Sequence, residues 1–421
     1  MFSTKRDQKM ANISLPLGID SLDITAQTLD KQGNIILDVK SKRTEIPCRK
    51  CGKLINKKRG FGDVLKVRHL SILDTPVYLR IRVVRYQCLD CDNDPTSCEE
   101  YDWMERKSKT TKGLDKYINR NLIHSTVEDV SKKEGITYDI VESALHRCVN
   151  TTVDWTVIKD LSTIGIDEIA IKKGQNDYIT IVSVKDDQDK LFVIGVLPGR
   201  LKETVKSFLE SIPPHLRKTV KSVCTDMCDS FVSAAKEVFG SRVIVIDRFH
   251  LAQLYRAKLD NLRLQEMKRL KQDLKASEYA KLENMMWILR KNHECLSKKD
   301  KAALELLYKY SPKLKAAYKA ALRLTHIFNA HHNREIASSK ISRWVVQMQK
   351  SDVRCFDGFI KTLEKYKSGI LNYFKNRKTS GFIEGLNNKI KVLKRRCYGL
   401  YKTASIFQRL FLDLKGYQAF A

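Results

Sequence analysis

The sequence predicts a multidomain α/β protein, and three observations lead to this class. Two C-x-x-C pairs lie near the N-terminus, short apolar runs recur between residues 160 and 247, and no glycine occurs between Gly240 and Gly358. Paired cysteines are typical of small metal-bound modules, closely spaced apolar runs of strands, and a long glycine-free stretch of helices. The 421 residues leave room for about two to four domains of ordinary size.

The chain is strongly basic. Its 78 Lys and Arg residues against 49 Asp and Glu give a net charge of +29 at pH 7. This excess favours a polyanionic partner, with nucleic acid as the default, over a basic surface that serves solubility alone. No run approaches the roughly 18 apolar residues of a membrane span, and the N-terminus lacks a signal-peptide core. We therefore expect no membrane association and a cytoplasmic location, which the odd number of cysteines also fits.

The two cysteine pairs are Cys48 with Cys51 and Cys88 with Cys91. Two intervening residues let each pair aim both sulfurs at one ion, so the four thiolates predict a structural Zn²⁺ site in a zinc ribbon. The alternatives are four ordinary buried cysteines or a redox pair, and Cys98 could replace Cys91. A β-hairpin predicted between the pairs would present basic side chains to DNA, namely Arg80, Arg82 and Arg85.

A helix-turn-helix is predicted over residues 125–147. Thr126 is placed to cap the first helix, Gly135 to make a left-handed turn, and Thr137 to cap the second helix. The second helix would then enter a DNA major groove. The alternative is a plain α-hairpin, because small helix pairs joined at a glycine are common.

Between residues 160 and 247, three hairpin-linked strands precede two strands that alternate with helices at 202–211 and 231–239. This is the strand order of an RNase H-like fold. The predicted strands are Ile164–Ile171, Tyr178–Val184, Leu191–Leu197, Val220–Cys224 and Val243–Ile246.

The glycine-free block after Gly240 predicts an all-α segment, with an α-hairpin turning at Ser311 and Pro312. Trp287 lies in this block. We expect it in the helical core beside Ile288, and the alternative is an exposed ring that stacks on a flipped base.

Three carboxylates suit a catalytic site on such a sheet. Asp167 interrupts the first apolar strand, Asp226 ends the fourth, and Glu384 lies alone among basic residues early in a predicted helix. Carboxylates so placed can hold two divalent metals for phosphodiester chemistry. Glu168 should face the other side of its strand, and Asp229 is expected to cap the next helix. For Glu384 the alternative is a solvent-exposed residue that favours the helix dipole.

The order of these motifs, with Asp247-Arg248-Phe249-His250 and Glu384-Gly385-Leu386-Asn387-Asn388, closely resembles DDE-type transposases of bacterial insertion sequences, specifically the ISL-three family. The resemblance covers about residues 45 to 415. It implies a DDE triad of Asp167, Asp226 and Glu384 that binds Mg²⁺ or Mn²⁺. Accessory active-site residues would be Asp247, His250 and Asn388. For Asp247 and His250 the alternative is a capped helix start with a structural histidine.

The resemblance also implies which molecules the protein binds and where its domains begin and end. The partners would be double-stranded DNA, as terminal inverted repeats and target, and a second copy of the chain in a homodimer or larger complex at the bacterial nucleoid. Basic residues around Glu384 would offset phosphate charge, namely Lys389, Lys391, Lys394, Arg395 and Arg396. The expected divisions are an N-terminal segment (1–44), the zinc ribbon (45–105), the helix-turn-helix (106–155), the catalytic domain (156–250 and 376–421) and an all-α insertion (251–375).

The predicted activity is that of a DNA transposase that cuts and joins strands. Two alternatives remain at this point: a non-catalytic regulator that binds DNA through the zinc and helix-turn-helix modules, and an RNase H-like nuclease that cuts without joining.

Overall fold

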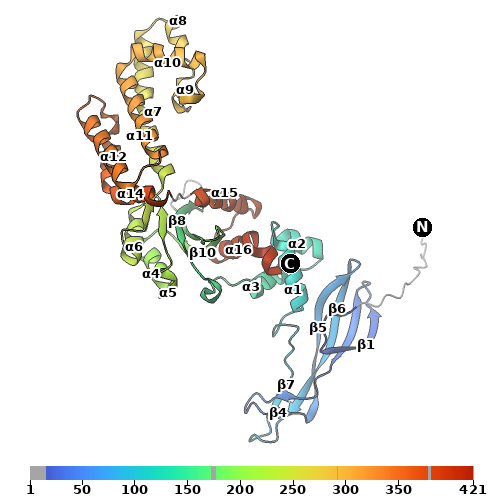
Figure 1. Cartoon of the computed structure of the whole chain (residues 1–421). Coiled ribbons are helices and arrows are strands. Elements are labelled where there is room, and N and C mark those ends of the chain that lie inside the picture. The colour runs from blue at the N-terminus through green and yellow to red at the C-terminus, as the bar shows by residue number, and fades with distance from the viewer. Residues whose placement is uncertain (1–15, 172–176, 292, 378–380, 421) are drawn as a thin grey trace, which may run out of the picture. The chain divides into compact units, whose positions relative to one another are not determined.

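The computed structural model describes residues 16–171, 177–291, 293–377 and 381–420 (Figure 1). The chain divides into two compact units. The first comprises residues 1–150 together with 415–421, and the second comprises residues 151–414. No helix in the described ranges is both long and apolar enough to cross a membrane.

The first unit contains a sheet with strand order β1-β2-β6-β5, in which β7 also pairs with β6. The predicted hairpin is confirmed as the long pair β5–β6, which turns at Leu73 and Asp74 with φ of 47° and 61°. Leu79 and Ile81 of β6 are buried while Arg80 is exposed, as a half-buried strand requires. The strands are β1 (Leu22–Leu29), β2 (Ile35–Ser41), β5 (Lys58–Ile72), β6 (Thr75–Gln87) and β7 (Thr96–Cys98).

Three helices follow this sheet: α1 (Lys112–Leu122), α2 (Val127–Glu134) and α3 (Tyr138–Cys148). The predicted pair is confirmed as α2 and α3. Gly135 ends α2 in the left-handed region at φ 60°, and the Thr126 hydroxyl accepts from Asp129 N–H. Thr137 occupies the N-cap position of α3, but the prediction that it caps by its side chain was wrong, because that side chain makes no capping hydrogen bond.

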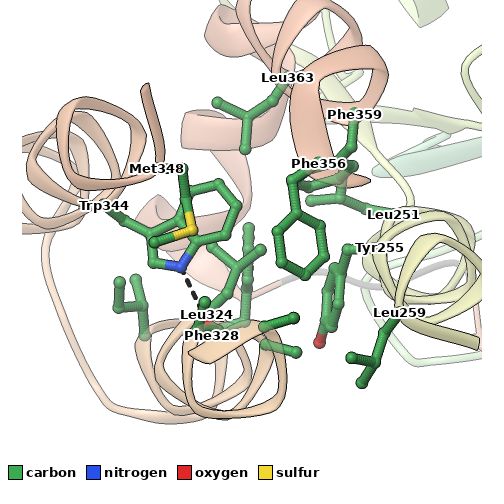
Figure 2. Packing of buried hydrophobic residues seen from close by; sticks show 14 of the residues in the cluster. Leu251, Tyr255, Leu259, Leu324, Phe328, Trp344, Met348, Phe356, Phe359 and Leu363 are labelled. Atoms are coloured by element: carbon green, nitrogen blue, oxygen red, sulfur yellow. Dashed lines mark hydrogen bonds between the residues drawn. The ribbon is translucent and has the colours of Figure 1, made fainter. Parts of the chain in front are cut away.

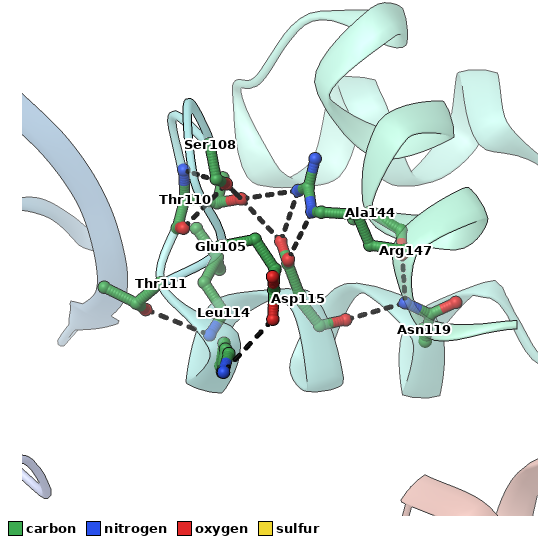
Figure 3. A network of polar contacts seen from close by, with 10 residues as sticks. Glu105, Ser108, Thr110, Thr111, Leu114, Asp115, Asn119, Ala144 and Arg147 are labelled. Carbon is green, nitrogen blue, oxygen red and sulfur yellow. Dashed lines mark hydrogen bonds and ion pairs between the residues drawn. The ribbon is translucent and has the colours of Figure 1, made fainter. Parts of the chain in front are cut away.

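A buried polar network ties α1 to α3 (Figure 3). The Asp115 carboxylate is almost fully buried, and Arg147 donates to both of its oxygens at 2.7 and 2.8 Å. Thr110 Oγ1 donates to the same carboxylate at 2.5 Å. Asn119 Nδ2 donates to the carbonyls of Asp115 and Ala144 at 2.8 and 3.1 Å. Because the buried charge of Asp115 on α1 is paired with Arg147 on α3, the network holds these two helices together.

The second unit is built on a five-stranded sheet of order β10-β9-β8-β11-β12. Strand β8 pairs antiparallel with β9 and parallel with β11, while β9 pairs antiparallel with β10 and β11 parallel with β12. All five strands predicted from apolar runs exist, with bounds shifted by at most two residues. They are β8 (Thr163–Ala170), β9 (Tyr178–Lys185), β10 (Leu191–Pro198), β11 (Ser222–Thr225) and β12 (Ile244–Ile246).

Helices pack on both faces of this sheet. Ile164 and Ile166 of β8 belong to one core with the helices α4 (Lys202–Ser211) and α6 (Asp229–Phe239), and short α5 (Pro214–Arg217) lies between these in the chain. Ile169, of opposite parity, packs in a second core with α15 (Gly381–Arg396) and α16 (Thr403–Phe420). The alternation of β8 therefore sends odd-numbered residues, Asp167 included, toward α15.

After β12, most described residues of the glycine-free block are helical, and the hairpin at Ser311 and Pro312 is confirmed. Its core joins Tyr255, Phe328, Trp344 and Phe359 (Figure 2) and continues into the sheet through Ile246. The helices are α7 (Arg248–Asp273), α8 (Ala276–Tyr279), α9 (Met285–Arg290), α10 (Lys298–Tyr310), α11 (Pro312–Asn329), α12 (Arg334–Gln349), α13 (Asp357–Lys365) and α14 (Lys367–Asn376).

The expectation that Trp287 is a core residue was wrong. Its side chain on α9 is 59% exposed, whereas the adjacent Ile288 is buried. A six-residue helix can bury only one side, and Met285 and Ile288 take that side.

Candidate functional site

The four predicted cysteines come together in the first unit. A two-stranded ribbon of β3 (Ile46–Pro47) and β4 (Leu54–Ile55) carries the first pair, and β6 runs into the second. The sulfurs of Cys48, Cys51, Cys88 and Cys91 all lie within 4.8 Å of one another, and the Sγ atoms of Cys51 and Cys88 are 3.8 Å apart. Tetrahedral zinc with bonds of about 2.3 Å separates its sulfurs by about 3.8 Å, so the set fits Zn²⁺.

The tight turn that carries the first cysteine pair favours the thiolate form of Cys48, which is the form that binds a metal. Gly52 takes φ 74° and its N–H donates to the Cys48 carbonyl at 2.9 Å, which closes a tight turn. The N–H groups of Cys51 and Lys50 point at the Cys48 sulfur and lower the pKa of that thiol to about 6. Cys98, the spare cysteine, is exposed on β7 outside the four-sulfur group.

The register of the parallel strands brings the candidate catalytic aspartates to matched positions. Thr225 of β11 pairs with Ile166 of β8 and with Ile246 of β12. The next residue on each strand is an aspartate, so Asp167, Asp226 and Asp247 stand at matched positions on three adjacent parallel strands. The carboxyl ends of parallel strands are where open α/β sheets place their ligand sites.

Asp167 is held from two sides. Its Oδ1 accepts from Glu168 N–H at 2.8 Å, and its Oδ2 accepts from Asn387 Nδ2 of α15 at 2.5 Å. Burial raises the pKa of this carboxyl, against these two hydrogen bonds and the nearby His250, which lower it. Glu168 points the other way, as expected, and pairs with Arg200 at 3.3 Å.

The carboxyl pKa is shifted further at Asp226 than at Asp167. Burial, followed by the charge of Asp167, raises the pKa of Asp226 to about 6, although Cys228 N–H donates to its Oδ1 at 3.1 Å. Two half-buried carboxylates that repel each other are the arrangement that a bound cation relieves.

Asp247 is buried and forms the N-cap of α7, accepting from Phe249 N–H at 2.9 Å. Its other oxygen lies 3.7 Å from His250 Nε2. Asp247 therefore caps the start of α7, and its accessory role in the active site stays a prediction. His250 also lies close enough to Asp167 and Asp226 to lower the pKa of both.

Helix α15 brings Glu384 to this edge. Its buried stripe of Ile383, Leu386, Ile390 and Leu393 is the one predicted. Ile383 packs against Gly165 so closely that a Cβ there would lie 2.6 Å from Ile383 Cδ1, so only glycine allows this approach. Glu384, the next residue, is exposed.

The asparagine that contacts Asp167 is Asn387, which lies one turn after Glu384. Asn388, predicted as an accessory residue, is exposed, and within the described chain it makes no hydrogen bond to the site. Asn387 Oδ1 is buried and has no hydrogen-bond partner among the described residues. Sequence periodicity places both asparagines near Glu384, and only the rotation of α15 on β8 separates them.

These oxygens suit a hard divalent cation. Carboxylate and amide oxygens are preferred Mg²⁺ ligands, and the unsatisfied Asn387 Oδ1 and the mutually repelling aspartates both fit one. Within the described residues, however, only the four cysteines form a group of three or more ligand atoms within 4.8 Å. Among the described residues, Asp167, Asp226 and Glu384 are therefore not drawn together as tightly as the four cysteines.

Lys365 and Tyr366, at the junction of α13 and α14, clamp the loop after Asp226. Tyr366 OH donates to the Met227 carbonyl at 2.8 Å and to Asp229 Oδ1 at 2.7 Å, and Lys365 Nζ reaches Asp229 Oδ2 at 2.5 Å. The prediction that Asp229 is a helix cap was wrong, because Cys228 is the N-cap of α6. The Asp229 side chain is instead committed to the insertion.

Several predicted DNA contacts are occupied within the protein. Arg80 forms an ion pair with Asp38, and Arg396 pairs with Asp413 at 2.6 Å. Lys394 Nζ donates to two carbonyls at the end of β8 at 2.6 Å, and Lys389 Nζ donates to the Asp413 carbonyl at 3.1 Å. Four other predicted residues are exposed, namely Arg82, Arg85, Lys391 and Arg395.

A sheet of this order with acidic residues at its parallel edge, in a chain that also carries a four-cysteine module, defines a class of DNA-processing enzyme, and sequence comparison agrees. A family model described as "Transposase" matches residues 164–410, and one described as "zinc-finger of transposase IS204/IS1001/IS1096/IS1165" matches residues 44–91. The chain belongs to the ISL3 family of DDE transposases.

Among its relatives, the chain is 27% identical over 356 residues to the transposase for insertion sequence element IS1001 of Bordetella parapertussis, with 84% of each chain covered. It is 23% identical over 282 residues to the transposase for insertion sequence element IS1557 of two Mycobacterium tuberculosis strains. That match covers 62% of this chain and 61% of the relative.

Proposed function

We propose that this transposase binds the terminal inverted repeats of an insertion sequence, cuts a phosphodiester bond at each end and joins the freed 3′ end to target DNA. The proposal places catalysis in an RNase H-like domain, supported by the order β10-β9-β8-β11-β12. The observation that carries it is the matched register of Asp167 and Asp226, with α15 locked beside them through Ile383 and Gly165.

In this proposal Asp167, Asp226 and Glu384 hold two divalent cations, Mg²⁺ or Mn²⁺. Such a pair supplies activation of the attacking oxygen and stabilisation of the leaving oxygen in an in-line displacement. Asn387 orients the Asp167 carboxylate, and the clamp of Tyr366 and Lys365 orients the loop that carries Asp226. The exposed Glu384 completes the site when cations and DNA are bound.

End recognition is assigned to the first unit. The zinc ribbon holds the β5–β6 hairpin, on which Arg82 and Arg85 are exposed, and α3 would act as the recognition helix in the major groove. Asp115 and Arg147 hold α3 against α1 from the side, which leaves the N-terminal half of α3 to contact bases. Pairing of two element ends requires at least two copies of the chain in the active complex.

The test is strand transfer with labelled element-end DNA, target DNA and Mg²⁺. Wild-type protein should produce joined molecules, and Asp226→Asn, which keeps the shape of the side chain, should reduce joining by at least about 10³-fold while leaving end binding intact.

Three results would overturn the proposal in different ways. Binding of the ends without cleavage by wild-type protein would indicate a regulator, and cleavage without joined product would indicate a nuclease. Equal joining by wild-type protein and Asp226→Asn would remove Asp226 from the catalytic site.

A further inference from the structure

The helical insertion carries a long stretch with almost no negative charge. From Leu306 to Ser351, which covers α11 and α12, the only acidic residue is Glu335, whereas nine residues are Lys or Arg. Elsewhere in the insertion cations are neutralised by carboxylates: Arg263 and Arg290 pair with Asp260, and Lys291 pairs with Asp300. The positive charge of α11 and α12 is therefore mostly not balanced by acidic residues of the same stretch, and it can attract a negatively charged partner.

The uncompensated cations face one another across a groove. Two adjoining hollows of about 460 and 610 Å³ lie between α11 and α12 and share Leu322, Arg323 and Gln347. The cations that line them are Lys319, Arg323, Lys340 and Arg343. We call this feature the α11–α12 groove. Among the described residues, none of these four has a carboxylate within 4.0 Å.

The floor of the groove is rigid and already covered. Trp344 is 2% exposed, and its Nε1 donates to the Ala320 carbonyl at 2.9 Å, which ties α12 to α11. Arg323 donates to Gln347 Oε1 at 3.0 Å and makes a second tie. Trp344 and Met348 are buried, and Lys319, Arg323, Lys340 and Arg343 stand along the walls of the groove. Four cations lining one groove favour a polyanion as its occupant.

The spacing of the cations suits a phosphate backbone. Lys319 and Arg323 are separated by one helical turn on α11, and Lys340 and Arg343 by one turn on α12. Side chains so spaced begin about 5–6 Å apart, so each pair can reach neighbouring phosphates of one strand. Arginine adds bidentate phosphate geometry, and lysine adds a mobile point charge.

We propose that the α11–α12 groove binds the phosphate backbone of duplex DNA outside the terminal repeats, as a second contact surface remote from the zinc ribbon and the helix-turn-helix in sequence. The choice of DNA as the polyanion rests on the proposed transposase function. Binding there is independent of base sequence, because the lining offers cations and amides rather than a base-reading helix end.

The test measures binding of full-length protein to a random-sequence duplex without added Mg²⁺, over a range of salt concentrations. The variant Lys319→Gln/Arg323→Gln/Lys340→Gln/Arg343→Gln should bind at least about tenfold more weakly. The slope of log K against log salt should fall by about 0.9 for each phosphate that the variant no longer neutralises, up to about 3.6. A charge-retaining variant, Lys319→Arg/Arg323→Lys/Lys340→Arg/Arg343→Lys, should bind nearly as wild type and shows that the fold is intact.

The matched control removes the same charge from α10 through Lys298→Gln/Lys299→Gln/Lys301→Gln/Lys309→Gln, four exposed residues outside the groove. An equal reduction of affinity in the groove variant and this control, or no reduction in either, would overturn the proposal. Displacement of bound DNA by poly-glutamate at a lower charge concentration than by DNA itself would also overturn it, in favour of an acidic protein partner. The proposed function fails separately, through absence of strand transfer by wild-type protein.

Discussion

The two candidate metal sites of this protein are built in opposite ways. The four cysteines lie on two short knuckles, with all sulfurs within 4.8 Å of one another. The carboxylates come from β8, β11 and α15, and Glu384 is exposed whereas Asp167 and Asp226 are half-buried. The cysteine site is thus built by local turns, whereas the carboxylates come from segments far apart in the sequence, as suits the open catalytic site that we propose. Polar residues of the first unit should therefore govern stability, and those of the second should govern rate.

The largest effect is expected at the closed site. Cys88→Ser removes one of four thiolates, and zinc content should fall from about one ion per chain to nearly none. The ribbon should unfold with it, since zinc binding of about 10–16 kcal/mol in small modules is folding free energy. Metal analysis and limited proteolysis would measure both changes. Cys98→Ser, outside the sulfur group, should keep its zinc, and absence of zinc from that variant would mean that the ligand set is wrong.

A large effect on rate is expected at the open site. Asn387→Ala removes the amide that holds Asp167 Oδ2, and strand cleavage should slow by roughly 10²-fold because the carboxylate loses its orientation. Asn388→Ala, one residue further on an exposed face, should cleave within about threefold of wild type. Cleavage assays on labelled element-end DNA decide between them. The reverse order of effects would show that α15 is rotated so that Asn388, not Asn387, faces Asp167.

The Asp115–Arg147 pair should affect stability without affecting chemistry. Asp115→Asn leaves Arg147 facing a neutral amide and should lower the free energy of unfolding of the first unit by about 2–3 kcal/mol. Urea unfolding measures this change. Glu128→Gln, which breaks an exposed ion pair with Lys132, should cost no more than about 0.5 kcal/mol. Similar values for the two variants would contradict the distinction between buried and exposed pairs.

The smallest effect is expected from the clamp on the Asp226 loop. Tyr366→Phe keeps the ring and loses the hydroxyl that holds Met227 O and Asp229, so strand transfer should fall by roughly tenfold. DNA binding should be unchanged. The control is Tyr310→Phe, which loses a hydrogen bond to Glu278 far from the aspartates in the chain. A drop in DNA affinity with the rate preserved would assign Tyr366 to binding instead of positioning.

Much of this architecture could be predicted from local pattern. The strands of the second unit, the helix pair around Gly135, the stripe Ile383–Leu386–Ile390–Leu393 and the cysteine set all follow from periodicity or spacing within a few residues. The domain boundaries, the triad roles and the DNA contacts stay predictions.

What local pattern missed depends on long-range contacts. Strands β1 and β2 were not anticipated, because β2 joins the sheet by parallel pairing with β6, some 40 residues along the chain. The choice of Asn387 over Asn388 depends on the rotation of α15 against Gly165. Arg80, Lys394 and Arg396 were predicted to contact DNA from charge alone, and charge does not reveal that Asp38, strand carbonyls and Asp413 occupy them.

Gly165 has a consequence for how the enzyme can vary. Ile383, which rests on it, and Glu384 are consecutive residues, so the position of one carboxylate is set by the absence of a methyl group on the neighbouring strand. Gly165→Ala would push α15 outward or force Ile383 to repack, and no charged group would change. A single substitution at Gly165 could therefore change the distance between Glu384 on α15 and Asp167 on β8 without altering any acidic residue.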